Sequence, residues 1–142
     1  MISKPKVLLA MDRKLAEQIF KKEDFEILTS FSEVTEVSSL PEKVDVSFIK
    51  ENILDKDICI TCWGTPSFSK DILEKANKLK LLAHSAGSVK PIVTDAVWEK
   101  GSRVTSSAPA IATAVAEITL GIMNISLKRV FQFNELTCKI FK

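Results

Sequence analysis

The segment best suited to binding a small anion is a run of small residues, Ser85 to Val89, that directly follows an apolar run. Small residues at a strand end let successive backbone N–H groups turn toward one point, and such a nest binds a carboxylate or a phosphate. Trp63-Gly64-Thr65 follows the preceding apolar run and would line the same crevice, because parallel strands end at one edge of their sheet. A tight structural turn explains the same small residues equally well.

Histidine and cysteine give weaker signals. His84, the only histidine, lies beside Ser85, but no acid is placed to orient its ring, and nucleophilic catalysis needs such partners together in space. Cys59 and Cys62 match C-x-x-C inside a predicted strand, where residues three apart point to opposite faces. We therefore expect two packed cysteines, no metal site and no catalytic residue in this chain.

The glycines do not form a nucleotide fingerprint. No two of them are close enough for G-x-G-x-x-G or a phosphate-binding P-loop; they are Gly64, Gly87, Gly101 and Gly121. We expect no cofactor-binding residues in this chain.

Short apolar runs alternate with helical patterns along the chain. The predicted strands are residues 6–11, 25–29, 57–62, 79–83 and 103–106. The predicted helices follow Asp12 and Ser69 and span 47–54, 94–100 and a long stretch from Pro109. This alternation predicts βαβ units, hence an α/β fold with a flavodoxin-like parallel five-stranded sheet, order 2-1-3-4-5, and helices on both faces.

The long helix from Pro109 is apolar around most of its circumference, with two apolar stripes rather than one. We expect residues 1–107 to form one lobe, and residues 108–142 to form a crossover helix and tail covered by a second domain or a second subunit. Insertion of the helix into the core of its own domain is the alternative. A membrane span is disfavoured, because Glu117 would put a charge at its centre.

Composition narrows the class of protein. The 142 residues carry a formal net charge of +2 without clustered basic residues, so nucleic acid is not an expected partner. Three irregularly spaced cysteines suit a reducing, cytoplasmic compartment. A homodimer through the helix after Pro109 is the expected assembly, because the same apolar patch serves both partners.

Three consecutive segments resemble the D-isomer-specific 2-hydroxyacid dehydrogenase family. They are CWGTPSFSKDILEKANKLK, KLKLLAHSAGSVKPIVTDAVWEKGSRVTSS and APAIATAVAEITLGIMNISLKR, in the order in which that family carries its strands, glycine-bearing substrate loop and Ala-Val-Ala-Glu crossover helix. The resemblance covers residues 57–130 well and residues 6–56 weakly.

The resemblance implies the substrate lobe of an oxidoreductase that acts on the CH–OH group of a D-2-hydroxy acid with NAD or NADP. By position, the substrate carboxylate would meet Gly87 and Ser88, with Val89 beside them, and Trp63 and Gly64 would form a second substrate-facing loop. The family's nucleotide-binding domain would begin after this chain, so we expect a truncated chain that is inactive alone and binds no cofactor. A non-catalytic binding or dimerisation module that keeps the lobe is the alternative.

The chain departs from the family pattern at three positions. Lys90 stands where an Asp usually follows the glycine loop, Ser88 replaces a common glycine, and Trp63 stands where some relatives carry a substrate-binding Arg. The last change makes a phosphorylated substrate less expected, whereas the backbone N–H donors of the loop remain.

Overall fold

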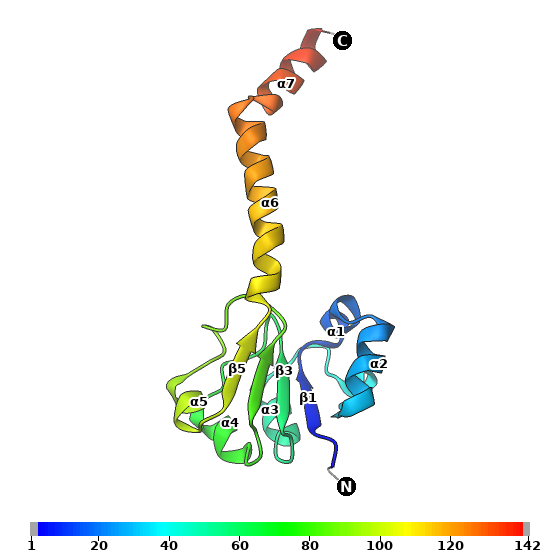
Figure 1. Ribbon diagram of the computed structural model, residues 1–142, viewed down its shortest axis with the longest axis vertical. Coiled ribbons are helices and arrows are strands. Elements are labelled where there is room, and N and C mark those ends of the chain that lie inside the picture. The colour runs from blue at the N-terminus through cyan, green and yellow to red at the C-terminus, as the bar shows by residue number, and fades with distance from the viewer. Residues whose placement is uncertain (1–2, 141–142) are drawn as a thin grey trace. The chain divides into compact units, whose positions relative to one another are not determined.

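The computed structural model describes residues 3–140, and these divide into two units at the boundary between Ser107 and Ala108 (Figure 1). The first unit holds a five-stranded sheet and its covering helices. The second unit consists of two helices.

The sheet is entirely parallel and has the order β2-β1-β3-β4-β5. Its strands are β1 Lys6–Ala10, β2 Glu33–Val34, β3 Ile58–Thr61, β4 Leu81–His84 and β5 Arg103–Ser106. The predicted α/β class and strand order are confirmed.

Two apolar layers sandwich the sheet, because successive side chains of each strand point to opposite faces. Leu8, Cys59 and Leu82 pack on one face against α3 (Val46–Asn52), α4 (Lys70–Lys75) and α5 (Asp95–Glu99). Leu9 and Met11 pack on the other face against α1 (Arg13–Ile19). Figure 1 shows α1 and α2 (Lys22–Phe31) together beside β1.

The prediction of a strand at Phe25–Thr29 is wrong, since these residues lie within α2. The backbone N–H of Lys21 donates to the Asp24 carboxylate at 2.8 Å and so secures the first turn of the helix. The Phe25 ring packs against Phe20, with ring centroids 5.4 Å apart. The second strand is instead the short segment Glu33–Val34, followed by the 3-10 helix Val37–Ser39.

The helices begin and end near the predicted signals, but the predicted side chain does not always make the capping hydrogen bond. Asp12 precedes α1, yet its carboxylate accepts the N–H of Val44 at 2.6 Å rather than capping the helix. Asp45, before α3, is a true cap whose side chain accepts the N–H of Phe48 at 2.8 Å. Gly101 follows α5 with φ +77°, the left-handed conformation that ends helices.

The second unit contains α6 Ala108–Leu127 and α7 Val130–Ile140, separated by Arg129 with φ +53°. None of the described residues in either helix is buried. By length and composition, α6 is also long and apolar enough to cross a membrane. The helix α7 was not predicted from the sequence.

Candidate functional site

A small hollow of about 90 Å³ lies where β3 and β4 end at the carboxyl edge of the sheet. It is lined by Cys62, Trp63, Gly64, Thr65, His84, Ser88, Pro91 and Ile92. The structure therefore brings three of the five predicted substrate-binding residues together. The other two, Gly87 and Val89, flank Ser88 in the chain but do not line the hollow.

The loop after β4 offers backbone donors. Within the described chain, no hydrogen-bond acceptor meets the N–H of Gly87, Ser88 or Val89. The Val89 carbonyl is occupied instead, since it accepts the N–H groups of Ile92 (3.0 Å) and Val93 (2.9 Å). Three consecutive N–H groups without an internal acceptor can donate to solvent or to a bound anion.

Gly87 is not required by the backbone of this loop. Its φ lies outside the left-handed region, and a Cβ added there would meet no atom within 4 Å. An alanine at this position can therefore probe binding without a steric clash in the fold.

The turn that carries Trp63 and Gly64 is held by Thr65, which the sequence places at the crevice without predicting its hydrogen bonds. The buried Thr65 hydroxyl donates to the Ala10 carbonyl at 2.7 Å and accepts the Cys62 N–H at 3.0 Å, so it ties the ends of β1 and β3 together. Gly64 adopts φ +80°, which any side chain would strain. Trp63 is left 60% exposed beside the hollow.

His84 belongs to this site, although the predicted strand stopped one residue before it. It ends β4 in register with Thr61, and its Nδ1 lies 3.0 Å from the Thr61 Oγ1. The ring is buried, and this burial lowers its pKa from the usual 6.5. The neutral imidazole therefore predominates at neutral pH, with one nitrogen engaged by Thr61.

Cys59 and Cys62 are both buried and lie in the apolar layers on opposite faces of the sheet, as the strand spacing predicts. Burial raises the pKa of both thiols, so neither is a ready thiolate. The part of the chain that the structure describes contains no cluster of three or more His, Cys, Asp or Glu suited to a metal ion.

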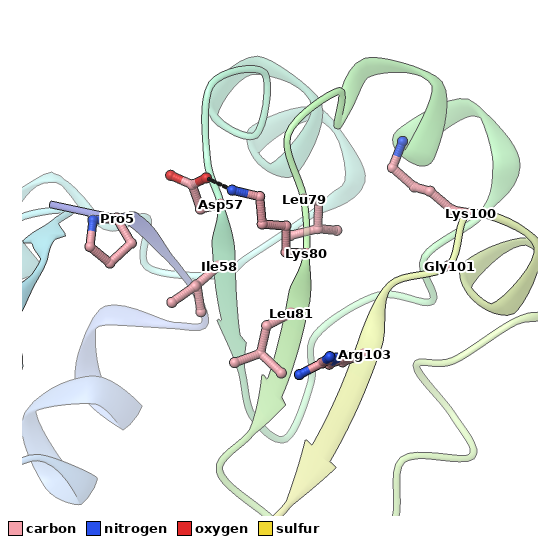
Figure 2. A pocket seen from close by; sticks show the side chains of 9 residues that line it. All are labelled: Pro5, Asp57, Ile58, Leu79, Lys80, Leu81, Lys100, Gly101 and Arg103. Atoms are coloured by element: carbon pink, nitrogen blue, oxygen red, sulfur yellow. Dashed lines mark hydrogen bonds and ion pairs between the residues drawn. The ribbon is translucent and has the colours of Figure 1, made fainter. Parts of the chain in front are cut away.

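A larger hollow, of about 670 Å³, lies at the opposite edge of the sheet, near the amino ends of β3, β4 and β5 (Figure 2). Ile58, Leu81 and Arg103, which share a register position, line it. Figure 2 shows the ion pair between Asp57 and Lys80 at its rim, 3.0 Å long. Its size does not make it the candidate site, because ligands of open parallel sheets bind at the carboxyl ends of the strands.

The described residues do not fit a nicotinamide dinucleotide. Such a cofactor needs closely spaced glycines between a strand and a helix, with the pyrophosphate at the helix N-terminus. The loops after β3 and β4 each contain one glycine, and the helices that follow them begin several residues later. We assign no cofactor contact to this chain.

Comparison with known proteins gives the class of protein to which this fold corresponds. No family model matches the chain. The chain is 34% identical over 82 residues to a D-3-phosphoglycerate dehydrogenase of Methanocaldococcus jannaschii, covering 58% of the chain and 16% of that protein. It is 24% identical over 113 residues to a hydroxypyruvate reductase of Thermotoga maritima, covering 80% of the chain and 33% of that protein.

Solved structures agree with these relatives. A Pyrococcus horikoshii protein shares the fold with a TM-score of 0.66 and 25% identity, covering 87% of this chain and 34% of that one. An NAD+-bound 3-phosphoglycerate dehydrogenase of Entamoeba histolytica matches with a TM-score of 0.59 and 19% identity, covering 87% of this chain and 39% of that one.

The chain is thus similar to an α/β domain of oxidoreductases. More particularly, its resemblance to the D-isomer-specific 2-hydroxyacid dehydrogenase family is confirmed. The chain spans between a sixth and a third of the length of the two curated relatives.

Proposed function

We propose that this chain is the substrate-binding lobe of an NAD(P)-dependent oxidoreductase that acts on the CH–OH group of a D-2-hydroxy acid, or on the corresponding 2-keto acid. The observation that carries the proposal is the carboxyl edge of β3 and β4. There the Trp63 turn, His84 and Ser88 line one hollow, and the N–H groups of residues 87–89 have no acceptor in the described chain.

The chemistry of this edge suits a small carboxylic acid. Backbone N–H groups of the loop would bind the carboxylate through charge-assisted hydrogen bonds. His84, neutral at pH 7 and oriented by Thr61, would contribute a polar contact rather than a positive charge. The nicotinamide cofactor would be bound by the parent enzyme outside the described residues of this chain, so catalysis is not assigned to them.

Binding can be tested on the chain as it stands by titrating oxalate, a planar analogue of a 2-keto acid, and recording backbone amide resonances. We expect shifts that saturate at millimolar ligand and are largest at Gly87, Ser88 and Val89. Acetate, which lacks the second oxygen pair, is the control and should bind more weakly. Shifts confined to another surface, with residues 87–89 unchanged, would contradict the proposal.

A matched pair of variants at Gly87 distinguishes the effect of losing the N–H donor from the effect of filling the space around it. Gly87→Ala keeps the N–H and meets open space, so we expect oxalate binding within about twofold of the unmodified chain. Gly87→Pro removes the N–H, and we expect about a tenfold loss, the equivalent of one hydrogen bond to a charged group. Far-UV circular dichroism of both variants verifies the fold. Equal affinities for the two variants would show that this N–H does not bind the acid.

Trp63 gives an independent optical readout. The chain contains two tryptophans, of which Trp63 lines the hollow and Trp98 lies on α5. In a Trp98→Phe variant, emission of the remaining Trp63 should change on oxalate addition with the same dissociation constant as the amide shifts. A dissociation constant that differs between the two readouts would separate Trp63 from the acid site.

A further inference from the structure

His84 has one ring nitrogen without a partner beside the candidate acid site. Its Nδ1 lies 3.0 Å from the Thr61 Oγ1, whereas no group of the described chain forms a hydrogen bond with its Nε2. The side chain is only 6% exposed, yet no buried polar side-chain atom of the described residues lacks a partner. Nε2 is therefore not sealed inside the core, and it opens into a solvent-accessible hollow.

The alternation of side chains along β4 decides which hollow this is. Leu82 and His84 lie two residues apart, so their side chains point to the same face of the sheet. On that face Leu82 packs in one apolar layer with Ile92, and Ile92 lines the hollow of about 90 Å³ at the candidate site. A second hollow beside His84, of about 170 Å³, lies at Ala83, whose side chain points to the opposite face. The His84 ring therefore faces the hollow of the candidate site.

The hydrogen bond to Thr61 fixes which ring nitrogen carries the hydrogen. Thr61 is 1% exposed, and within the described residues the only partner of its hydroxyl is the Nδ1 of His84. A buried hydroxyl hydrogen without an acceptor is costly, so the hydroxyl donates to Nδ1. Burial lowers the pKa of His84 and keeps the ring neutral, so that Nδ1 is the acceptor and Nε2 carries the hydrogen. The site thus contains an N–H donor that no described residue uses.

No charged side chain among the described residues lines this hollow. Its lining consists of residues that are neutral at pH 7: Cys62, Trp63, Gly64, Thr65, His84, Ser88, Pro91 and Ile92. Lys90, the nearest cation along the loop, is exposed and lies outside the lining. An ionised group that enters without a counter-charge loses its hydration and gains no equivalent partner. Beyond the acid group that the N–H donors bind, the hollow therefore suits an uncharged ligand.

We propose that His84 is a specificity-determining residue, whose Nε2–H donates to an uncharged oxygen of the bound acid, and that Thr61 is its positioning residue. The preferred ligand is a small 2-keto or 2-hydroxy acid whose third carbon carries neither a phosphate nor a carboxylate. This inference rests on the proposed function, which assigns the acid group to the N–H donors of residues 87–89.

The position of the ring hydrogen can be measured without any ligand. In a nitrogen-15-labelled chain at about pH 8, the ring of the single histidine is neutral, and the shift of each nitrogen reports whether it carries a hydrogen. We expect the hydrogen on Nε2. Thr61→Val removes the hydroxyl and should leave a mixture of both forms, whereas Thr61→Ser should restore the preference. A hydrogen on Nδ1 in the unmodified chain, or an unchanged ring in Thr61→Val, would overturn the proposal.

The charge preference can be tested with D-glycerate and 3-phospho-D-glycerate, which differ only in the phosphate on the third carbon. D-Glycerate should shift the amide resonances of residues 87–89 together with the His84 ring, and should bind more tightly by about tenfold or more, because the phosphate has no counter-charge. Equal or tighter binding of the phosphorylated acid at residues 87–89 would overturn this inference and leave the proposed function standing. Absence of amide shifts with both acids would instead overturn the proposed function, on which the inference rests.

Variants at His84 separate the donor from the shape of the ring. His84→Phe keeps a flat ring and removes both nitrogens, and we expect about a tenfold loss of D-glycerate affinity, the equivalent of one hydrogen bond to a charged ligand. His84→Gln retains an N–H donor and should lose less. Equal losses in the two variants, with the fold verified by circular dichroism, would show that the Nε2–H does not bind the acid.

Two variants at Trp63 test the charge argument in the opposite direction. Trp63 is 60% exposed at the hollow, so both substitutions should be compatible with the fold. Trp63→Lys and Trp63→Gln both remove the indole, but only the lysine adds a cation. The preference for D-glycerate over 3-phospho-D-glycerate should be about tenfold smaller in Trp63→Lys than in Trp63→Gln, because an ammonium can pair with the phosphate. Equal preferences in the two variants would overturn the proposal.

Discussion

The burial and the orientation of the His84 side chain have separate causes, one within its own strand and one on the neighbouring strand. Its burial comes from the alternation of β4, and its orientation comes from Thr61 at the same register position on β3. Neither fact is visible in the sequence around position 84, where only an adjacent serine stands out. The reason is physical: a cross-strand partner lies far away in the chain, here 23 residues.

The titration of His84 should reveal this environment directly. The chain has a single histidine, so its ring resonances need no assignment. Burial disfavours the charged ring, and we expect a pKa below 6.5 in the folded chain and a normal value in urea. A folded-state pKa equal to or above the value in urea would contradict the buried position.

The same group should make stability depend on pH. Because the folded-state pKa of His84 is lowered, its contribution is complete above the unfolded pKa of about 6.5 and is lost as pH falls through the folded pKa. The free energy of unfolding should therefore decline between these two values in the unmodified chain. In His84→Gln, which cannot titrate, that part of the decline should be absent in urea titrations at stepped pH.

Asp57 anchors the amino edge of the sheet. Its carboxylate accepts the N–H of Lys6 at 3.1 Å and the ammonium of Lys80 at 3.0 Å, and these bonds lower its pKa. Asp57→Ala should reduce the free energy of unfolding by about 1–3 kcal/mol, since the Lys6 N–H loses its partner. Because the folded-state pKa is lowered, the difference from the unmodified chain should shrink as pH falls below 3.8; a constant difference would exclude an ionic role.

Among the strands and helices of the first unit, most were predicted correctly from apolar runs and from the residues that begin and end helices. The continuous runs at β1 and β3 were predicted as strands because parallel sheets bury both faces of their strands. The prediction of a strand from Phe25 to Thr29 failed because a five-residue segment with three apolar side chains suits a strand and a helix turn equally well. The segment is helical because the Asp24 carboxylate holds the first turn of α2 and the Phe25 ring packs against Phe20.

For the candidate site, the sequence predicted that it lies where the strands end and that the loops after β3 and β4 form it. It could not predict that Ser88 would line the hollow while Gly87 and Val89 would not, because this depends on how the loop turns after His84. The hydrogen bonds of Thr65 could not be predicted for a related reason. Its role is to join β1 and β3, which become neighbours only in the folded sheet.

A substitution at Gly101 can test how the helix α5 ends. It ends α5 at φ +77°, and its N–H donates to the Trp98 carbonyl at 2.9 Å. Gly101→Ala should lower the free energy of unfolding by about 1 kcal/mol, because a Cβ is strained in the left-handed region. Gly101→Asn should cost less, since asparagine tolerates that region. Equal losses in both variants, measured by urea unfolding, would place the cost in packing rather than in the backbone.

At the scale of the whole chain, every buried residue of the described structure lies at or before Ser102. The members of both apolar layers around the sheet all belong to the first unit. We expect a chain that ends at Ser107 to unfold cooperatively in urea with the slope expected for about 107 residues. Loss of the cooperative transition would mean that the second unit contributes to the core, contrary to the observed burial.

The three cysteines differ in accessibility in a way that makes the chain report on its own opening. Cys59 and Cys62 are buried on opposite faces of the sheet, whereas Cys138 is exposed on α7. A maleimide should therefore add once within seconds, and twice more only when the sheet opens. The masses of the adducts, followed over time, would give the opening rate of the first unit without any engineered label.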